Sequence, residues 1–151
     1  MTIRPATGKD LTAWSRMRAA VYSDLDPALD QAEMDRVLAS DDFTCFIAEA
    51  PDGAAAGFAE VSLRNIVDGV AGGPVGYLEG LYVEAAHRGT GTGRALIDRA
   101  IAWCREHGCS HLATDAELEN TAAQNLYEHL GFERKWTVVQ FLKEIASKED
   151  S

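Results

Sequence analysis

The chain has 151 residues, of which 46% are hydrophobic and 25% are charged, and its formal net charge is −10. These values are ordinary for one soluble globular domain, and the acidic balance argues against nucleic acid as the main partner, since phosphate backbones demand basic patches. No apolar run approaches a membrane span, and the N-terminus lacks the apolar core of a signal peptide. Three cysteines without a framework pattern favour reduced thiols and a cytoplasmic location.

The first half of the chain predicts one strand, two helices and an antiparallel pair of strands. In order, the expected elements are a strand over 2–6, helices over 10–22 and 31–39, and strands over 43–50 and 54–63. The helices are placed by apolar residues at helical spacing, and a polar, aspartate-rich break separates them. Pro51-Asp52-Gly53 is a turn signal between the two strands.

The centre of the fold is expected in a buried strand over 76–83, followed by a glycine-rich loop and a helix over 93–107. The strand is rich in aromatic and branched residues, which suit a pleated buried surface. Strict alternation predicts one strand face made of Val75, Tyr77, Glu79, Leu81 and Val83. The inward face of the helix is expected to consist of Leu96, Ile97, Ala100, Ile101 and Cys104.

The last part of the chain predicts a short strand over 110–114, a helix from Asn120 or Thr121 to 130, and one or two final strands over 133–145. Residues 1–146 are interpreted as a single domain and 147–151 as a polar tail. Because strands and helices alternate irregularly around one clear hairpin, we expect an α/β fold with a mixed sheet and helices on both faces.

The loop before the central helix carries Gly89, Gly91 and Gly93 within five residues. The first N–H groups of a helix lack partners inside it, and glycines let a bulky anion approach them closely. Arg88 and Arg94 add positive charge, so the pattern favours a phosphate or pyrophosphate ligand. A flexible turn that only caps the helix is the alternative. A P-loop is excluded because the Lys-Ser/Thr ending is missing after the last glycine. The dinucleotide fingerprint is excluded because its third glycine should follow the second by three residues, and here it follows by two.

The spacing Arg88-x-x-Gly91-x-Gly93 resembles the acetyl-coenzyme A pyrophosphate site of the GNAT superfamily of N-acetyltransferases. The resemblance implies the GNAT acyltransferase fold, with a mostly antiparallel central sheet, and acetyl-coenzyme A as cosubstrate. Backbone amides of 88–93 would hold the pyrophosphate, and the strand edge at 81–83 would pair with the pantetheine arm. The implied cofactor-binding residues are Leu81, Tyr82, Val83, Arg88, Gly89, Thr90, Gly91, Thr92, Gly93, Arg94 and Asn120.

A second constellation, Asn120-x-x-Ala123-x-x-x-Tyr127-x-x-x-Gly131-Phe132, follows at the distance expected for this superfamily. In GNAT enzymes a similar Asn contacts the pantetheine arm, and a similar Tyr points its hydroxyl near the acetyl sulfur. A phenol there can donate a proton to the departing thiolate. On the residues alone, Tyr127 could equally be a core aromatic and Asn120 a helix cap.

Glu79 stands mid-strand among apolar neighbours, where a buried, unpaired carboxylate would be costly. It should therefore face a cleft or a partner, and a structural ion pair is the alternative. Gly80 beside it indicates a bulge or a close backbone approach, which would open a gap in the strand. Asp115 ends its strand at the carboxyl edge, a common ligand position in α/β sheets, although an ordinary loop aspartate is the alternative.

Several blocks resemble the aminoglycoside 6′-N-acetyltransferases: Met17-Arg18 with Tyr22-Ser23-Asp24, the strand 76–83, Thr114-Asp115-Ala116-x-Leu118-x-Asn120, Leu130-Gly131-Phe132 and Val138-Val139-x-Phe141. This resemblance implies that Glu79 and Asp115 bind substrate amines and act with Tyr127 in catalysis. Tyr22 would line the substrate pocket, and the enzyme would be a homodimer that confers antibiotic resistance. Ile66 and Trp136 depart from the family pattern.

Acetyl transfer would be direct, in a ternary complex, because no cysteine has a matched base in the sequence. Two other functions stay open: acetylation of a polyamine or a peptide N-terminus, and a catalytically silent GNAT-fold module that binds acyl-coenzyme A. No metal is expected. Cys104, His107, Cys109 and His111 could ligate zinc, but they cross a helix end and a turn without the usual separation of ligand pairs.

Overall fold

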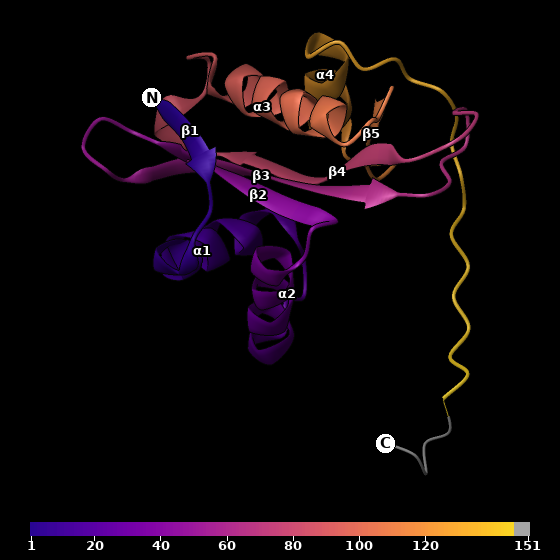
Figure 1. The fold of residues 1–151 in the computed structure, drawn as a ribbon, viewed down its shortest axis with the longest axis horizontal. Coiled ribbons are helices and arrows are strands. Elements are labelled where there is room, and N and C mark those ends of the chain that lie inside the picture. Colours follow the sequence, from indigo (N-terminus) through magenta and orange to yellow (C-terminus); the bar gives the residue numbers. More distant parts are fainter. Residues whose placement is uncertain (147–151) are drawn as a thin grey trace. The chain divides into compact units, whose positions relative to one another are not determined.

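The computed structural model describes residues 1–146 (Figure 1). Backbone contacts concentrate in two units, a first unit of residues 1–115 and a second unit that begins at Ala116. Among the described residues, no helix is both long and apolar enough to cross a membrane. The predicted polar tail at 147–151 lies outside the described residues.

The first unit is built on a five-stranded mixed sheet in the order β1-β2-β3-β4-β5. The strands are β1 (Thr2–Pro5), β2 (Phe43–Glu49), β3 (Ala55–Arg64), β4 (Val75–Val83) and β5 (Leu112–Ala113). Neighbours from β1 to β4 are antiparallel, and β5 pairs with β4 in parallel. The predicted mixed, mostly antiparallel sheet is confirmed.

Helices cover both faces of this sheet, as the sequence predicts (Figure 1). Helices α1 (Leu11–Val21) and α2 (Pro27–Ala39) lie on one face, and α3 (Thr92–Glu106) lies on the other. Helix α2 begins four residues before its predicted start, because Pro27 takes its first position and the Asp26 side chain caps the N–H groups of Ala28 and Leu29. Short 3₁₀ turns precede α1 (Gly8–Asp10) and α3 (Ala85–His87).

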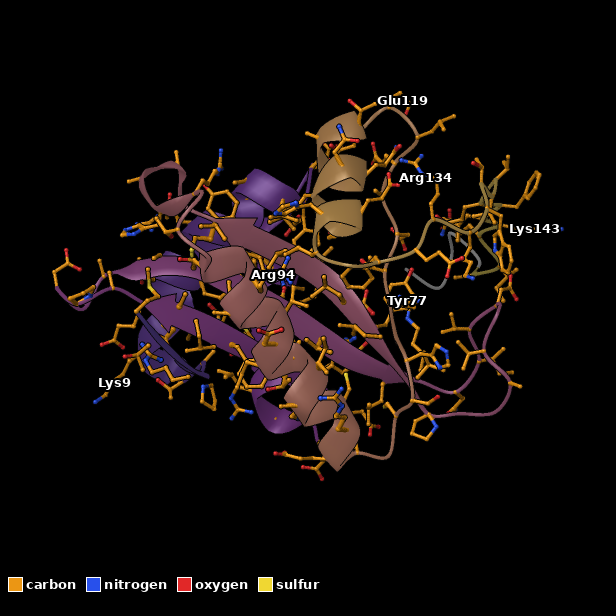
Figure 2. All side chains as sticks on the ribbon, turned by 90° about the horizontal axis from the view of Figure 1, so that it is seen from above. Lys9, Tyr77, Arg94, Glu119, Arg134 and Lys143 are labelled. Carbon is orange, nitrogen blue, oxygen red and sulfur yellow. The ribbon has the colours of Figure 1, made fainter. Side chains whose placement is uncertain are left out.

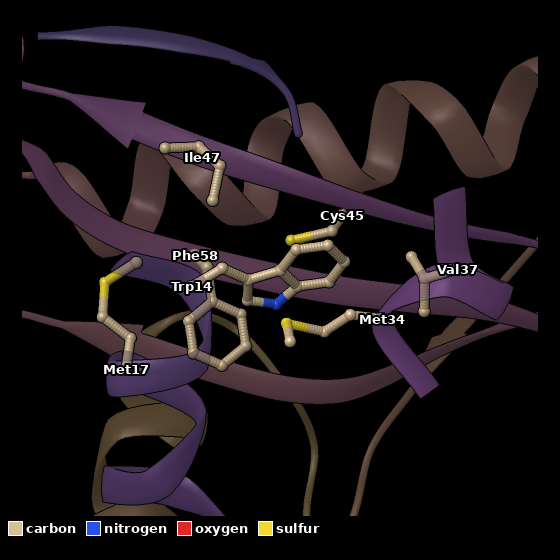
Figure 3. Packing of buried hydrophobic residues seen from close by; sticks show 7 residues of the cluster. All are labelled: Trp14, Met17, Met34, Val37, Cys45, Ile47 and Phe58. Atoms are coloured by element: carbon tan, nitrogen blue, oxygen red, sulfur yellow. The ribbon is translucent and has the colours of Figure 1, made fainter. Parts of the chain in front are cut away.

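The face under α1 and α2 carries an apolar cluster, drawn in Figure 3. Its buried members are Trp14, Met17, Met34, Val37, Cys45, Ile47 and Phe58. On the opposite face α3 buries four of its five predicted inward residues, and only Ile101 is partly exposed. Full burial of such a side chain contributes about 1.5–3 kcal/mol, so these contacts hold the helices on the sheet.

The second unit contains α4 (Thr121–His129), which Asn120 caps by accepting the N–H of Ala123 at 3.0 Å. The helix ends in a Schellman motif: Gly131 has a φ of +98°, and the N–H of Phe132 donates to the carbonyl of Tyr127. This turn places the rings of Tyr127 and Phe132 edge to face, 5.6 Å apart. Leu126 of this helix is 42% exposed.

The predicted final strands over 133–145 are wrong, because the described residues after Gly131 form no helix or strand. Large apolar side chains in this segment are exposed, with values of 78% for Val139, 89% for Phe141 and 94% for Leu142. Alternating apolar residues show which face a strand would bury, but a strand forms only where a neighbouring strand supplies a ladder.

Candidate active site

Strand β4 is interrupted by a bulge at Glu79. Glu60 of β3 faces Gly80, but the next residue, Val61, faces Leu78, so Glu79 is an extra residue without a partner on β3. The bulge that Gly80 predicts is therefore present. It also breaks the alternation: Val75, Tyr77 and Glu79 share the predicted face, but the prediction is wrong for Leu81 and Val83. Val83 pairs with Gly57, where a Cβ would meet Leu96 of α3, so the end of β4 has changed faces.

Glu79 is held by two side chains of β3. Ser62 donates its hydroxyl to Glu79 Oε1 at 2.6 Å. Arg64 donates from Nη2 to both carboxylate oxygens, at 2.9 and 3.1 Å, and from Nε at 3.3 Å. The structure thus contains the ion pair that the sequence left as an alternative. The Glu79 side chain remains 30% exposed, so its carboxylate is also open to solvent and to a ligand.

Asp115 is tied to the same place through Tyr77. The Tyr77 hydroxyl donates to Asp115 Oδ2, and the Arg64 guanidinium carbon lies 3.4 Å from the centre of the Tyr77 ring. Partial burial, together with the Asp115 carboxylate, raises the pKa of the Tyr77 phenol, so the phenol stays a donor at neutral pH. We call Ser62, Arg64, Tyr77, Glu79 and Asp115 the acidic cluster.

Three members of this cluster are not among the site residues that the sequence predicts: Ser62, Arg64 and Tyr77. Ser62 lies opposite Tyr77 in the register of β3 and β4, and Arg64 follows Ser62 by two residues on the same face. That pairing depends on the register of the two strands that the 65–74 loop connects. The signal in the sequence was only an Arg and a Ser at alternating positions before a glycine-rich loop.

Tyr22 follows the end of α1 and packs against Gly80 on the face of the sheet that also carries Glu60, Ser62 and Arg64. A Cβ on Gly80 would overlap the Tyr22 hydroxyl and would lie 2.9 Å from the Tyr22 Cζ. The hydroxyl donates to Glu60 Oε2 at 3.2 Å. Burial raises the Tyr22 pKa far above its usual value, with a further contribution from Glu60. The only residue that fits beside Tyr22 at this point of β4 is therefore a glycine.

Glu60 belongs to a buried ionic network beneath Tyr22. Arg18 of α1 donates to both oxygens of Glu60 and, at 2.6 Å, to Asp30 of α2. Ser15 donates to the second Asp30 oxygen, also at 2.6 Å. Burial raises the pKa of Glu60 to about 7, and Arg18 opposes that rise. Removing Arg18 would leave two buried carboxylates without their cation, which is strongly destabilising. The intact network therefore holds Glu60, and with it the Tyr22 hydroxyl, in place.

The loop at 88–93 has the shape that the glycine spacing predicts. Gly89 and Gly91 have φ values of +75° and +86°, and Gly91 is the N-cap of α3. A Cβ at either position would meet no atom within 4 Å, so the loop surface is open. Arg88 Nε donates to the carbonyl of Val83 at 2.9 Å, which ties the loop to the end of β4. Arg94 lies in the first turn of α3 (Figure 2).

The edge of β4 toward β5 is only briefly covered. The parallel ladder consists of Gly76 with Leu112 and Tyr77 with Ala113, and Thr114 Oγ1 then donates to the carbonyl of Leu78 at 2.9 Å. Beyond this point the described residues show no β5 partner for residues 79–83. An open strand edge thus runs from the bulge toward the glycine loop.

The four residues weighed as zinc ligands have other roles. Cys104 is buried, and Gly108 and Cys109 close a Schellman motif that brings the two thiols into contact. Burial raises the pKa of Cys104 to about 12, so it stays a thiol. His107 stacks on Trp103 at 4.2 Å, and His111 Nδ1 is 2.8 Å from the Ser110 hydroxyl. Within residues 1–146 no group of three or more His, Cys, Asp or Glu side chains has metal-binding geometry.

Comparison with known proteins gives consistent results. The sequence matches the acetyltransferase (GNAT) family over residues 11–132. It is similar to the aminoglycoside N(6′)-acetyltransferase type 1 of Stenotrophomonas maltophilia, at 42% identity over 141 residues, which cover 93% of this chain and 91% of that protein.

Two solved structures extend the comparison. The aminoglycoside antibiotic 6′-N-acetyltransferase of Acinetobacter haemolyticus, in its apo form, has a TM-score of 0.90 and 35% identity, with coverage of 97% of this chain and 100% of that one. AAC(6′)-Iy in complex with the bisubstrate analog CoA-S-monomethyl-acetylneamine has a TM-score of 0.89 and 32% identity, with coverage of 95% and 98%.

Proposed function

Because the chain belongs to the GNAT acetyltransferase family, and within it to the aminoglycoside 6′-N-acetyltransferases, we propose that it acetylates the 6′-amine of aminoglycosides with acetyl-coenzyme A. The observation that carries this proposal is the acidic cluster, in which two carboxylates from different segments are linked through Arg64 and Tyr77 beside a bulge in β4. Aminoglycosides are polycations, and a half-exposed pair of carboxylates suits their ammonium groups.

The cosubstrate site is proposed at the open edge of β4 and the glycine loop. Loop residues 88–93 would hold the pyrophosphate on backbone N–H groups at the α3 N-terminus, where the helix dipole favours an anion. The main chain at 81–83 would pair with the pantetheine arm, since that edge lacks a β5 partner among the described residues. Arg88 and Arg94 add positive charge at this end, and Asn120 keeps its proposed contact with the pantetheine arm.

The acetyl thioester supplies the carbonyl carbon that the amine attacks. A protonated amine has no lone pair, so the site must bind an ammonium group and then take one proton from it. Glu79 and Asp115 are proposed to do both, the proton passing directly or through water. Tyr22 would line the amine side of the bulge. Tyr127 would donate a proton or a hydrogen bond as the thiolate leaves.

We also propose that the protein works as a homodimer in the cytoplasm. The exposed apolar side chains between Val138 and Ile145 support a second copy of the chain as partner. All three cysteines are free thiols, which suits a reducing compartment.

A thiol-release assay with acetyl-coenzyme A tests this function. We expect turnover with kanamycin and tobramycin, and none with derivatives that carry a 6′-hydroxyl. Glu79→Ala and Asp115→Ala should each lower kcat/KM for kanamycin by roughly 10²-fold, while acetyl-coenzyme A affinity changes little. Tyr127→Phe should lower kcat more than it weakens cosubstrate binding. Turnover of spermidine or a peptide, with no turnover of 6′-amino aminoglycosides, would refute the proposed substrate.

A further inference from the structure

We propose that Arg64 is a positioning residue of the acidic cluster, a resident cation that orients Glu79 and limits how strongly the site attracts a substrate ammonium group. This inference rests on the function proposed above and adds a residue to it. Arg64 is the last residue of β3 and is 44% exposed, so it can be replaced without opening the core.

The geometry of Arg64 is specific to a guanidinium. Its Nη2 reaches both oxygens of Glu79 within 3.1 Å, and its Nε reaches Oε1 at 3.3 Å. At the same time its planar group lies over the Tyr77 ring, 3.4 Å from the ring centre. A lysine keeps the charge but offers neither the flat stacking surface nor the fork of donors.

These contacts connect Arg64 to both carboxylates. It binds Glu79 directly, and Ser62, two residues earlier on the same face of β3, holds the same carboxylate, so the Glu79 side chain has one fixed direction. It also packs on Tyr77, whose hydroxyl donates to Asp115. A change at Arg64 therefore loosens the relative placement of the two groups that would bind and deprotonate the amine.

The positive charge of Arg64 has the opposite effect on the substrate: it weakens the attraction of the cluster for an ammonium group. With Arg64 present the cluster carries one positive and two negative charges, a formal total of −1, and without it the total is −2. An incoming ammonium group must share the Glu79 oxygens that Arg64 already contacts. Arg64 should thus weaken cation binding while it improves the orientation needed for proton removal. These two effects can be separated experimentally.

Two substitutions separate charge from shape. Arg64→Gln removes the charge, and we expect it to bind kanamycin roughly fivefold more tightly at low salt, an advantage that shrinks as salt rises. Its kcat should fall roughly tenfold, because Glu79 is no longer fixed. Arg64→Lys should restore wild-type kanamycin affinity but leave kcat low. Arg36→Gln, an exposed position on α2, removes the same charge from the chain and should change neither value.

Isothermal titration of the full chain with kanamycin and with spermidine, at two salt concentrations, measures the binding. Equal or weaker cation binding by Arg64→Gln, or full kcat in Arg64→Lys, would overturn the role given to Arg64. A wild-type protein that binds kanamycin without acetylating it would refute the proposed function but not the role of Arg64. The kanamycin affinities of wild type and Arg64→Gln would still test that role. Binding of neither cation by the wild type would refute both.

Discussion

Residue 80 has room for no side chain larger than the hydrogen of glycine, because the Tyr22 hydroxyl occupies the place that a Cβ would take. We predict that Gly80→Ala destabilises the fold by about 1–3 kcal/mol, since either the bulge or Tyr22 must move. Urea unfolding monitored by tryptophan fluorescence would measure this loss. The same shift should lower kcat/KM, because Glu79 precedes residue 80 directly.

A double-mutant cycle identifies the cause of that loss. Tyr22→Phe removes the closer of the two clashing atoms, so Gly80→Ala should cost less in the Tyr22→Phe background than in the wild type. Gly8→Ala is a suitable control, because a Cβ there would have no neighbour within 4 Å. Additive free energies in the cycle would show that the Tyr22 hydroxyl is not the obstacle.

Single residues also explain why the site needs a buried ionic network. Arg18 lies on the inward face of α1, and it neutralises Glu60 and Asp30 where water cannot. Tyr22 reaches the bulge only because Glu60 accepts its hydroxyl. The position of a residue that would line the substrate pocket therefore depends on charges from α1, α2 and β3.

At the scale of elements, the start of α1 depends on Asp10. Its carboxylate accepts hydrogen bonds from both terminal guanidinium nitrogens of Arg4, each at 2.8 Å, and from the N–H of Thr7 at 2.7 Å. The Arg4 hydrogen bonds are the main reason that the Asp10 pKa lies below its usual 3.8. This arrangement fastens β1 to the beginning of α1, which carries Trp14 and Arg18.

We predict that Asp10→Asn lowers the free energy of unfolding by about 1–3 kcal/mol at pH 7. A carboxyl whose pKa is lowered by folding stabilises the native state above its unfolded pKa, and that contribution is lost as pH falls through the folded pKa. The difference between wild type and variant should therefore shrink below pH 3.8. Denaturant titrations at pH 7 and pH 3, with Asp35→Asn as an exposed control, would measure it. A difference independent of pH would contradict this assignment.

At the scale of the whole molecule, the exposed apolar segment leads to a prediction about assembly. Val139, Phe141 and Leu142 are each at least 78% exposed, and burying them against a second copy would remove apolar area from water. Sedimentation velocity at micromolar concentration should show a dimer. Val139→Lys with Phe141→Lys should shift it to monomer, whereas Leu29→Lys, at another exposed position, should not. A wild-type protein that sediments only as a monomer would refute the homodimer.

The sequence by itself determined the elements whose causes are local. The loop and helix from Arg88 to Glu106 follow from glycine spacing, an apolar stripe and a helix end at Gly108. The β2–β3 hairpin follows from two apolar runs around Pro51-Asp52-Gly53. The bulge was indicated by a carboxylate and a glycine within an apolar strand, because neither fits an unbroken buried ladder.

Only the tertiary structure decided how distant residues meet. Arg64, Tyr77 and Asp115 lie far apart in the chain, and their contact depends on strand register and on β5 pairing with β4. The bulge then moved Val83 to the face opposite the one that alternation predicted. The expected strands over 133–145 did not form, since a ladder needs a partner that a strand's own residues cannot supply. Local propensity follows from neighbours in sequence, whereas register and pairing follow from which surfaces the rest of the chain brings alongside.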